Sequence, residues 1–455
     1  MRLLFTTLQT YETDFYGRVG EELERRGHET AHIAVSRAAT RLLRERGLEA
    51  RCLMDELDEP DSYPDEVARI ERAYPIPHIR DVYYADAIVE GQSEEWAVRR
   101  TVRHFRALER LVDELRPDVL VPEVGNETMR VVAHLIGLQR GIPVLFLLYT
   151  IFPDPLRLSV DTLHAPIVPP EEVRELSEAE RRELEAFKTA FTERAKPIRD
   201  YRRSPVEWRR AKLFAGHLRR KRGEDRDNEY LRPWRLLRSN AAETLRGKAA
   251  LPFYDELDPA RSYVYFPLHV TDDYKIRKVI PHTVDQASLV EQVADALPPG
   301  YDVVLKEHPM SVGRNSLRLL RRLRTRANVR LVKPTTSTHD LIQGAAAVAV
   351  ISSTVGLEAL LYEKPVLTLG QPFYSGYGVT LDVDSFREIR EKAPELLRFQ
   401  PDPETIDRFL HAAMRACRPG APVLVDRSQE NAVRLAGSIE EAARAALADR
   451  EPAPA

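Results

Sequence analysis

The sequence predicts an α/β protein with two Rossmann-like, doubly wound domains facing a cleft and a charged helical insertion between them. Three observations lead to this prediction. Apolar strands alternate with amphipathic helices in the first third of the chain, and the alternation returns after residue 262. Strands that are apolar on both faces are typical of parallel sheets covered by helices. The length of 455 residues is also about three times that of one average domain.

The N-terminal third supplies the first predicted sheet. We expect strands at 2–7, 30–35, 119–124 and 144–149, with helices at 13–26, 94–115 and 127–140. Residues 51–93 are rich in Pro and Asp, and we expect loops with short elements there.

The middle of the chain differs in composition. The stretch Glu171–Lys196 is charged and helical in pattern, and Tyr201–Ala250 holds 15 Arg or Lys against 6 Asp or Glu. Four aromatic residues are interleaved with these charges: Trp208, Phe214, Tyr230 and Trp234. A basic helical face favours contact with an anionic membrane surface, where each nearby cation contributes about 1 kcal/mol. A solvated helical hairpin explains the pattern equally well, and no motif supports nucleic-acid binding.

The C-terminal half predicts the second sheet. We expect strands at 262–267, 302–309, 329–332, 347–352 and 365–370, with helices at 285–296, 315–325, 338–344, 354–362, 403–416 and 427–448. The expected segments are therefore an N-terminal domain at 1–165, the insertion at 166–255, a C-terminal domain at 256–425, and a final helix and tail at 426–455.

Composition excludes several classes of protein. The 68 basic and 71 acidic residues leave a net charge of −3, which argues against a globally basic nucleic-acid coat. Neither GxGxxG nor GxxxxGK[ST] occurs, which weakens dehydrogenase and P-loop interpretations. Two cysteines without ligand spacing predict no disulfide framework and no structural zinc. No apolar run is long enough to span a bilayer, so we expect a cytoplasmic protein, with the inner membrane face as a second location.

The most informative candidate site follows the strand at 347–352. Ser352, Ser353 and Thr354 lie where this strand passes into a helix. Unpaired N–H groups at a helix start, with hydroxyls beside them, predict a bound nucleotide phosphate, although N-capping explains part of the pattern. Glu358 lies about one turn after Thr354 and would accept hydrogen bonds from ribose hydroxyls; a solvated helix glutamate is the alternative.

A second candidate site ends the strand at 302–309. Lys306 and His308 stand at its tip, and Pro309 stops the strand. His308 would stabilise or protonate a departing phosphate, and Lys306 would neutralise the same charge. His269, after the strand at 262–267, and Tyr374, in a Gly/Pro loop after residue 370, are weaker candidates for substrate contacts.

The N-terminal half offers carboxylates after the strand at 119–124. Glu123 or Glu127 would act as the base for an acceptor hydroxyl. Asn126 as a helix cap, with Glu127 favourable to the helix dipole, is the more ordinary interpretation.

These motifs resemble a known family. YVYFPLH at 263–269, VVLKEHP at 303–309 and ISSTVGLEALLYEKPVLTLGQPFYS at 351–375 are similar, in order and spacing, to the capsule polysaccharide biosynthesis/export family. That family includes the bacterial capsule Kdo transferases of GT-B type. The resemblance covers residues 260–380; the first half is similar only in layout, so no catalytic base is carried over.

The resemblance implies a glycosyltransferase with a nucleotide-sugar donor, CMP-linked by analogy, and a surface polysaccharide or glycolipid acceptor. It implies that His308, Pro309, Ser352 and Ser353 hold the donor's nucleotide and phosphate. No cofactor is expected, although a divalent ion bound through the donor phosphates is compatible with the pattern. The alternatives are a polyol-phosphate transferase or UDP-sugar epimerase of GT-B-like fold, and a non-catalytic glycan-export or scaffold protein.

Overall fold

The structure, a computed structural model, describes residues 1–193, 208–270, 273–279 and 285–450. Parts of three expected segments lie outside these ranges: residues 194–207 of the insertion, residues 271–272 and 280–284 of the C-terminal domain, and the tail at 451–455.

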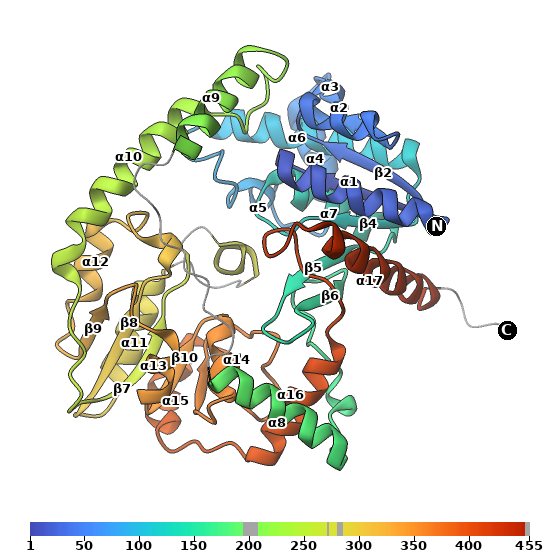
Figure 1. The fold of residues 1–455 in the computed structure, drawn as a ribbon. Coiled ribbons are helices and arrows are strands. Elements are labelled where there is room, and N and C mark those ends of the chain that lie inside the picture. The colour runs from blue at the N-terminus through green and yellow to red at the C-terminus, as the bar shows by residue number, and fades with distance from the viewer. Residues whose placement is uncertain (194–207, 271–272, 280–284, 451–455) are drawn as a thin grey trace. The chain divides into compact units, whose positions relative to one another are not determined.

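The chain divides into two compact units (Figure 1). Unit 1 consists of Met1–Ala165, Arg209–Pro233 and Cys417–Ala455, and unit 2 consists of Pro166–Trp208 and Trp234–Ala416. The stretch 166–255, which we expected to form one insertion, is therefore divided between both units. Charge and helical pattern predicted helices here, but they do not determine against which core a helix packs.

Unit 1 is built on a four-stranded parallel sheet in the order β3-β2-β1-β4. This sheet contains β1 (Arg2–Thr7), β2 (Glu29–Ala34), β3 (Glu49–Cys52) and β4 (Val119–Pro122). Two further strands of unit 1, β5 (Leu145–Tyr149) and β6 (Leu156–Val160), pair with each other. Its helices are α1 (Thr10–Arg25), α2 (Arg37–Glu45), α3 (Leu53–Glu56), α4 (Tyr63–Ala73), α5 (Arg80–Tyr83), α6 (Glu94–Leu115), α7 (Thr128–Arg140), α9 (Trp208–Arg222) and α17 (Gln429–Ala448).

Two features of unit 1 differ from the sequence expectation. The irregular stretch 51–93 contains the 11-residue helix α4, which begins at the cap Ser62 with Pro64 in its first turn. The strand β5 pairs antiparallel with β6, and a single parallel bridge from Leu120 to Val144 leads into it from β4. Helix α17, from the far end of the chain, packs with α1 in the same hydrophobic core.

Unit 2 contains a six-stranded parallel sheet in the order β12-β11-β10-β7-β8-β9. Its strands are β7 (Ser262–Pro267), β8 (Tyr301–Lys306), β9 (Val329–Val332), β10 (Ala347–Val350), β11 (Val366–Thr368) and β12 (Leu381–Asp382). Its helices are α8 (Glu178–Thr192), α10 (Pro233–Ala249), α11 (Gln286–Ala296), α12 (Leu317–Leu323), α13 (Thr338–Gly344), α14 (Thr354–Leu360), α15 (Ile389–Leu396) and α16 (Pro403–Ala416).

The strand order of unit 2 indicates where on its sheet a ligand would bind. Counted along the chain the order reads 6-5-4-1-2-3, the Rossmann arrangement, and the direction of winding reverses between β7 and β10. Both units thus have the predicted parallel α/β architecture, and the predicted Rossmann-like fold class is confirmed. Ligands of such sheets bind at the carboxyl ends of the strands beside this reversal.

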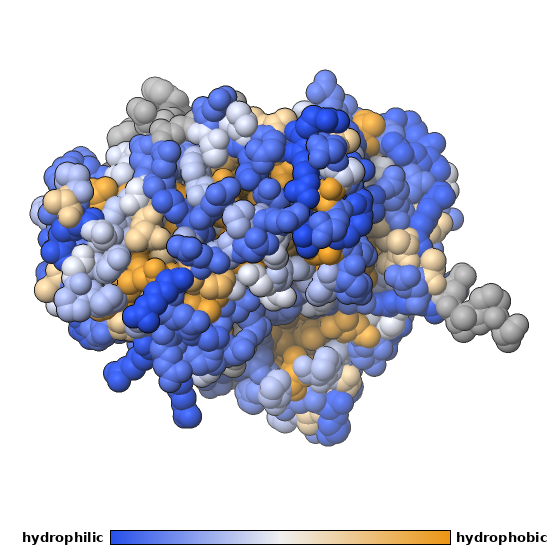
Figure 2. Space-filling model, turned by 90° about the horizontal axis from the view of Figure 1, so that it is seen from below, coloured by the Kyte–Doolittle hydropathy of each residue, from blue (hydrophilic) through white to orange (hydrophobic). Residues whose placement is uncertain are grey.

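The surface matches the high content of charged residues. The face drawn in Figure 2 is largely hydrophilic, with separate hydrophobic patches. Within the described ranges, every helix is too short or too polar to cross a bilayer.

Candidate functional site

The candidate site of unit 2 is the carboxyl edge of β7, β8 and β10. These three strands are neighbours in the sheet, so the segments that follow them lie side by side. Pro267 at the end of β7 is in register with Lys306 at the end of β8, and the Leu268 N–H donates to the Lys306 carbonyl at 3.0 Å. The sequence motifs at 267–269, 306–309 and 351–354 therefore meet at one edge.

His269 joins the segments after β7 and β10. The Ser352 N–H donates to His269 Nε2 at 3.2 Å, and both residues are buried. Burial, with smaller effects of the neighbouring Lys275 and His308, lowers the pKa of His269 from 6.5 to about 3. The imidazole is therefore neutral at physiological pH, and because Nε2 accepts, Nδ1 carries the proton. Gln286, which the sequence argument missed, holds the His269 backbone from both sides at 2.8 and 3.2 Å.

His308 is also a neutral hydrogen-bonding group. It stands before the short turn Pro309–Ser311, and its Nδ1 accepts from the Met310 N–H at 3.2 Å. Partial burial lowers its pKa; Asp273 opposes this effect, and Lys306 and Arg314 add to it. We expected a charge change near neutral pH, whereas these surroundings favour the uncharged ring with its proton on Nε2. His308 can thus donate from Nε2.

Lys306 and Glu358 form an electrostatic pair at the same edge. Lys306 is 8% exposed, and its Nζ donates to the Thr336 carbonyl at 3.0 Å and to the Thr338 hydroxyl. Burial lowers the Lys306 pKa to about 8, and Glu358 opposes the shift. Burial raises the Glu358 pKa to about 7, against the effects of Lys306 and of a hydrogen bond from Thr354. Both groups can therefore change charge close to neutrality.

The three hydroxyls after β10 have different tasks. Ser353 is the N-cap of α14, and its Oγ accepts from the Val355 N–H at 3.2 Å. The Thr354 hydroxyl lies 3.4 Å from a Glu358 oxygen. Ser352 is 8% exposed. The ordinary capping interpretation thus holds for Ser353, while Ser352 and Thr354 keep hydroxyls at the edge.

Tyr374 stabilises the turn formed by Ser352, Ser353 and Thr354. Its side chain is fully buried, and its hydroxyl donates to the Ser353 carbonyl. A methyl group at Gly356 would lie 2.2 Å from the Tyr374 hydroxyl, so the helix start and the ring are tightly packed. The sequence favoured Tyr374 as a candidate for substrate contact, but a fully buried ring acts on the turn and not on a ligand.

The corresponding edge of unit 1 is acidic. Glu123 follows β4, is 7% exposed, and accepts a hydrogen bond from the Tyr16 hydroxyl. Glu12, in the first turn of α1, accepts from Arg130 at 2.9 and 3.0 Å. Arg130 Nη1 also lies 3.1 Å from Glu127 Oε2. One guanidinium therefore contacts the carboxylates of Glu12 and Glu127 and interacts electrostatically with that of Glu123.

Burial favours the protonated carboxyl groups of Glu123 and Glu127 in this acidic cluster, which we define as Glu12, Glu123, Glu127 and Arg130. Burial raises the Glu123 pKa to about 7, with Arg130 opposing and Glu12 adding to the shift. Burial also raises the Glu127 pKa, again against Arg130. The Glu127 side chain is 28% exposed, so it is the more accessible of the two predicted bases.

Sequence reasoning missed Glu12, Tyr16 and Arg130 in this cluster. Arg130 stands three residues after Glu127 on a predicted helix, a spacing that could have indicated the pair. Glu12 and Tyr16 belong to α1, far from Glu123 in the sequence, so no local pattern predicts that they meet it.

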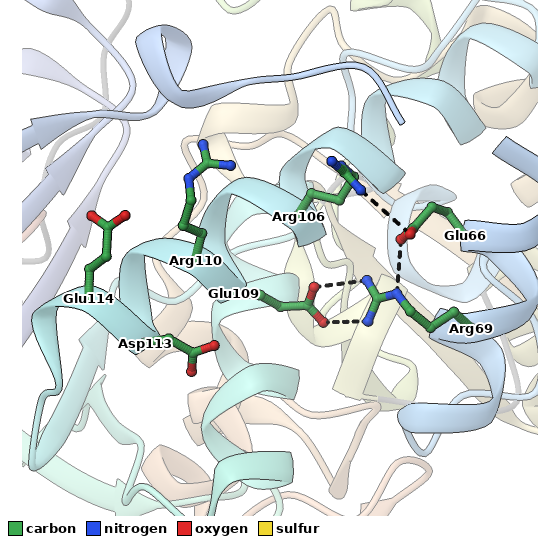
Figure 3. Close-up of a pocket in the computed structure, with 7 residues that line it drawn as sticks. All are labelled: Glu66, Arg69, Arg106, Glu109, Arg110, Asp113 and Glu114. Atoms are coloured by element: carbon green, nitrogen blue, oxygen red, sulfur yellow. Dashed lines mark hydrogen bonds and ion pairs between the residues drawn. The ribbon is translucent and has the colours of Figure 1, made fainter. Parts of the chain in front are cut away.

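A separate cavity of about 540 Å³ lies against α4 and α6 (Figure 3). Arg69 makes a two-pronged ion pair with Glu109 at 2.8 and 2.9 Å and also contacts Glu66 at 2.9 Å. Three arginines and four acidic residues line this cavity, so the cavity has no excess positive charge to bind a phosphate. None of its lining residues comes from the loops after β1 or β4, and we do not assign it to the chemistry.

No cluster of His, Cys, Asp or Glu in the described ranges has a geometry suited to a metal ion.

Comparison with known proteins supports the sequence motifs. The family model described as capsule polysaccharide biosynthesis protein matches residues 214–412. The resemblance to this family is confirmed. The matched region contains every candidate residue of the unit 2 edge and ends before the final helix of unit 1.

Among curated relatives, the chain is similar to Protein FixF of Sinorhizobium fredii, with 29% identity over 34% of this chain and 38% of that protein. It is similar to the capsule polysaccharide modification protein LipA of Neisseria meningitidis serogroup A, with 31% identity over 22% of this chain and 15% of LipA. The chain thus matches well under half the length of these relatives.

Two solved structures illustrate the structural comparison. One is Thermosulfurimonas dismutans KpsC, a beta Kdo 2,7 transferase, with 18% identity, 71% of this chain and 88% of that chain covered, and a TM-score of 0.33. The other is the calicheamicin glycosyltransferase CalG4, with 14% identity, 99% of both chains covered and a TM-score of 0.32. The fold of this chain is established by its strand order.

Proposed function

We propose that this protein is a glycosyltransferase that moves a sugar, Kdo-like by analogy, from a CMP-linked nucleotide donor to a surface polysaccharide or glycolipid. Unit 2 binds the donor, and unit 1 binds and activates the acceptor hydroxyl. The protein acts in the cytoplasm or at the inner face of the membrane. The family match over residues 214–412 supports a role in capsule polysaccharide synthesis.

One observation carries the donor assignment. The hydrogen bond from Ser352 to His269 joins two segments at the point where the strand order reverses. The edge around it presents neutral imidazoles, hydroxyls and Lys306. These groups donate hydrogen bonds and tolerate an anion, as a phosphate diester requires. Glu358, at the same edge, is suited to accept from sugar hydroxyls.

The mechanism follows from the protonation states. His308 donates from Nε2 to a phosphate oxygen and so stabilises the leaving nucleotide. Lys306 and Glu358 have pKa values near neutrality, so either group can gain or lose a proton as negative charge develops on the leaving phosphate. In unit 1, Glu127 takes the proton of the acceptor hydroxyl; burial raises its pKa, and Arg130 opposes that shift.

Calorimetric titration of the full chain with CMP, CDP and UDP tests the donor site. We expect CMP to bind most tightly and His308→Ala to weaken binding at least about tenfold, the loss typical of a charge-assisted hydrogen bond. His164→Ala, an exposed histidine of unit 1, is the matched control and should bind as the parent does.

Different outcomes point to different proteins. Preferential binding of CDP or UDP would replace the proposal by polyol-phosphate transfer or epimerisation, which product analysis identifies. No binding of any of the three nucleotides would contradict a donor site and favour the scaffold alternative.

A further inference from the structure

Helix α10 has one face committed to unit 2. A methyl group at Gly313 would lie 1.9 Å from the Glu243 carbonyl oxygen, so the loop at 312–314 passes directly against the helix. Arg314 Nε lies 3.8 Å from a Glu243 oxygen. Gly247, one turn after Glu243, faces Val312. Glu243 and Gly247 therefore mark the inner face.

The opposite face of α10 exposes large apolar side chains. Trp234 is 60% exposed, Leu237 is 47% exposed and Leu245 is 68% exposed. Leu237 follows Trp234 by three residues, and Leu245 follows Leu237 by eight, so the three side chains lie on one stripe of the α-helix. Leu251, just beyond the helix end, is 66% exposed. Single exposed leucines are ordinary, but a stripe over one helix face indicates a contact surface.

The charges on this helix are unequal. It contains four cationic residues and one acidic residue, and the acid, Glu243, belongs to the inner face. Arg238 and Lys248 are exposed and fall on the same stripe as the apolar side chains. We define the outer face of α10 as Trp234, Leu237, Arg238, Leu245 and Lys248.

The preceding helix α9 is more basic, but two of its cations, Arg220 and Lys221, bond within unit 1. Arg220 bonds to Asp225 at 3.1 Å and to the Thr10 and Ser36 hydroxyls at 2.8 Å, over the edge of the unit 1 sheet. Lys221 donates to the Asn228 carbonyl at 2.9 Å. The net charge of α9 therefore overstates the positive charge it offers to solvent, and α10 differs by its stripe of exposed apolar side chains.

We propose that the outer face of α10 docks on the surface of a bilayer that contains anionic lipids. Apolar side chains enter the boundary between headgroups and acyl chains, and the cations beside them pair with lipid phosphates. This combination distinguishes the face from a purely electrostatic patch. The docking gives a structural basis to the proposed location at the inner membrane face, and it does not rest on the transferase activity, because it needs neither donor nor acceptor.

Sedimentation of the full chain with lipid vesicles tests the proposal. We expect binding to vesicles of phosphatidylcholine mixed with phosphatidylglycerol, and little binding to phosphatidylcholine alone. Leu245→Gln should weaken binding about tenfold through lost apolar burial. Arg238→Gln should weaken it about fivefold, an effect that high salt removes.

Leu213→Gln on α9 is the matched control, since Leu213 is 61% exposed and also lies among cations. It should bind vesicles like the parent, and circular dichroism and nucleotide calorimetry should show all three variants folded. Equal weakening by Leu213→Gln, or none by the α10 variants, would overturn the assignment. So would equal binding to neutral vesicles, dimerisation lost in Leu245→Gln, or displacement from vesicles by a soluble anionic polysaccharide.

Discussion

The carboxyl edges of the two sheets have the same topology and opposite chemistry. In unit 2, His269, His308, hydroxyls and Lys306 accompany Glu358. In unit 1, Arg130 lies among the carboxylates of Glu12, Glu123 and Glu127. Both edges lie where parallel strands end, so the fold provides the place and the side chains decide the ligand. An anionic donor fits the first edge, and a hydroxyl that must lose a proton fits the second.

The largest expected effect separates catalysis from donor binding. Glu127→Gln should lower the turnover of sugar transfer by about 10²–10⁴, the range for loss of a general base. Donor affinity, measured by calorimetry, should stay within about twofold, because the change is in unit 1. Glu123→Gln should affect turnover less, since its carboxyl is buried against Tyr16. If both variants keep full turnover, unit 1 does not supply the base.

The second prediction concerns stability. Arg130→Met should lower the free energy of unfolding by about 3–5 kcal/mol, because it leaves buried carboxylates without their cation. Lys306→Met, the corresponding change in unit 2, should lower it by less, about 1 kcal/mol, because burial disfavours that ammonium and Glu358, with a pKa of about 7, can stay protonated without it. Urea unfolding of both variants measures the difference. Equal losses would mean that the two cations have the same structural role.

The third prediction is a pair of opposite pH dependences. The raised pKa of Glu123 means that the folded state keeps a proton that the unfolded state releases, so its contribution to stability is lost as pH rises from about 4.5 to about 7. The lowered pKa of His269 means that its contribution is lost as pH falls below 6.5.

Urea unfolding at pH 5 and pH 7.5 tests this pair. Glu123→Gln should gain stability relative to the parent by up to about 2–3 kcal/mol at the higher pH, and His269→Gln should gain relative stability at the lower pH. Parallel pH profiles for the parent and both variants would contradict the assigned shifts.

The smallest expected effect concerns the turn at the donor edge. Tyr374→Phe removes the hydrogen bond to the Ser353 carbonyl and should cost about 1 kcal/mol of stability, visible as a lower melting temperature. Tyr377→Phe, which loses a bond to the Val168 carbonyl in the same unit, is the control for a hydroxyl remote from the turn. A drop in CMP affinity for Tyr374→Phe alone would show that the turn positions donor groups.

The sequence predicted the fold class and most strands because periodicity is a local property. The strand 2–7 and the helices 94–115, 338–344 and 403–416 have the expected bounds. The helix α4 was missed because Pro and Asp at its start read as a loop, although they form a capped first turn. The antiparallel pairing of β5 was missed because an apolar strand does not reveal its partner.

For the candidate sites, the sequence alone determined that polar motifs follow three strands of one parallel sheet, which is enough to expect them at a common edge. Only the tertiary structure decided that His269 bridges two of them, that Tyr374 is buried, and that Glu12 and Arg130 join Glu123. Protonation states and pairings depend on burial and on charges far away in the chain. The same reason applies to the basic stretch Tyr201–Ala250. Its local charge could not show which cations bond within the protein and which face solvent.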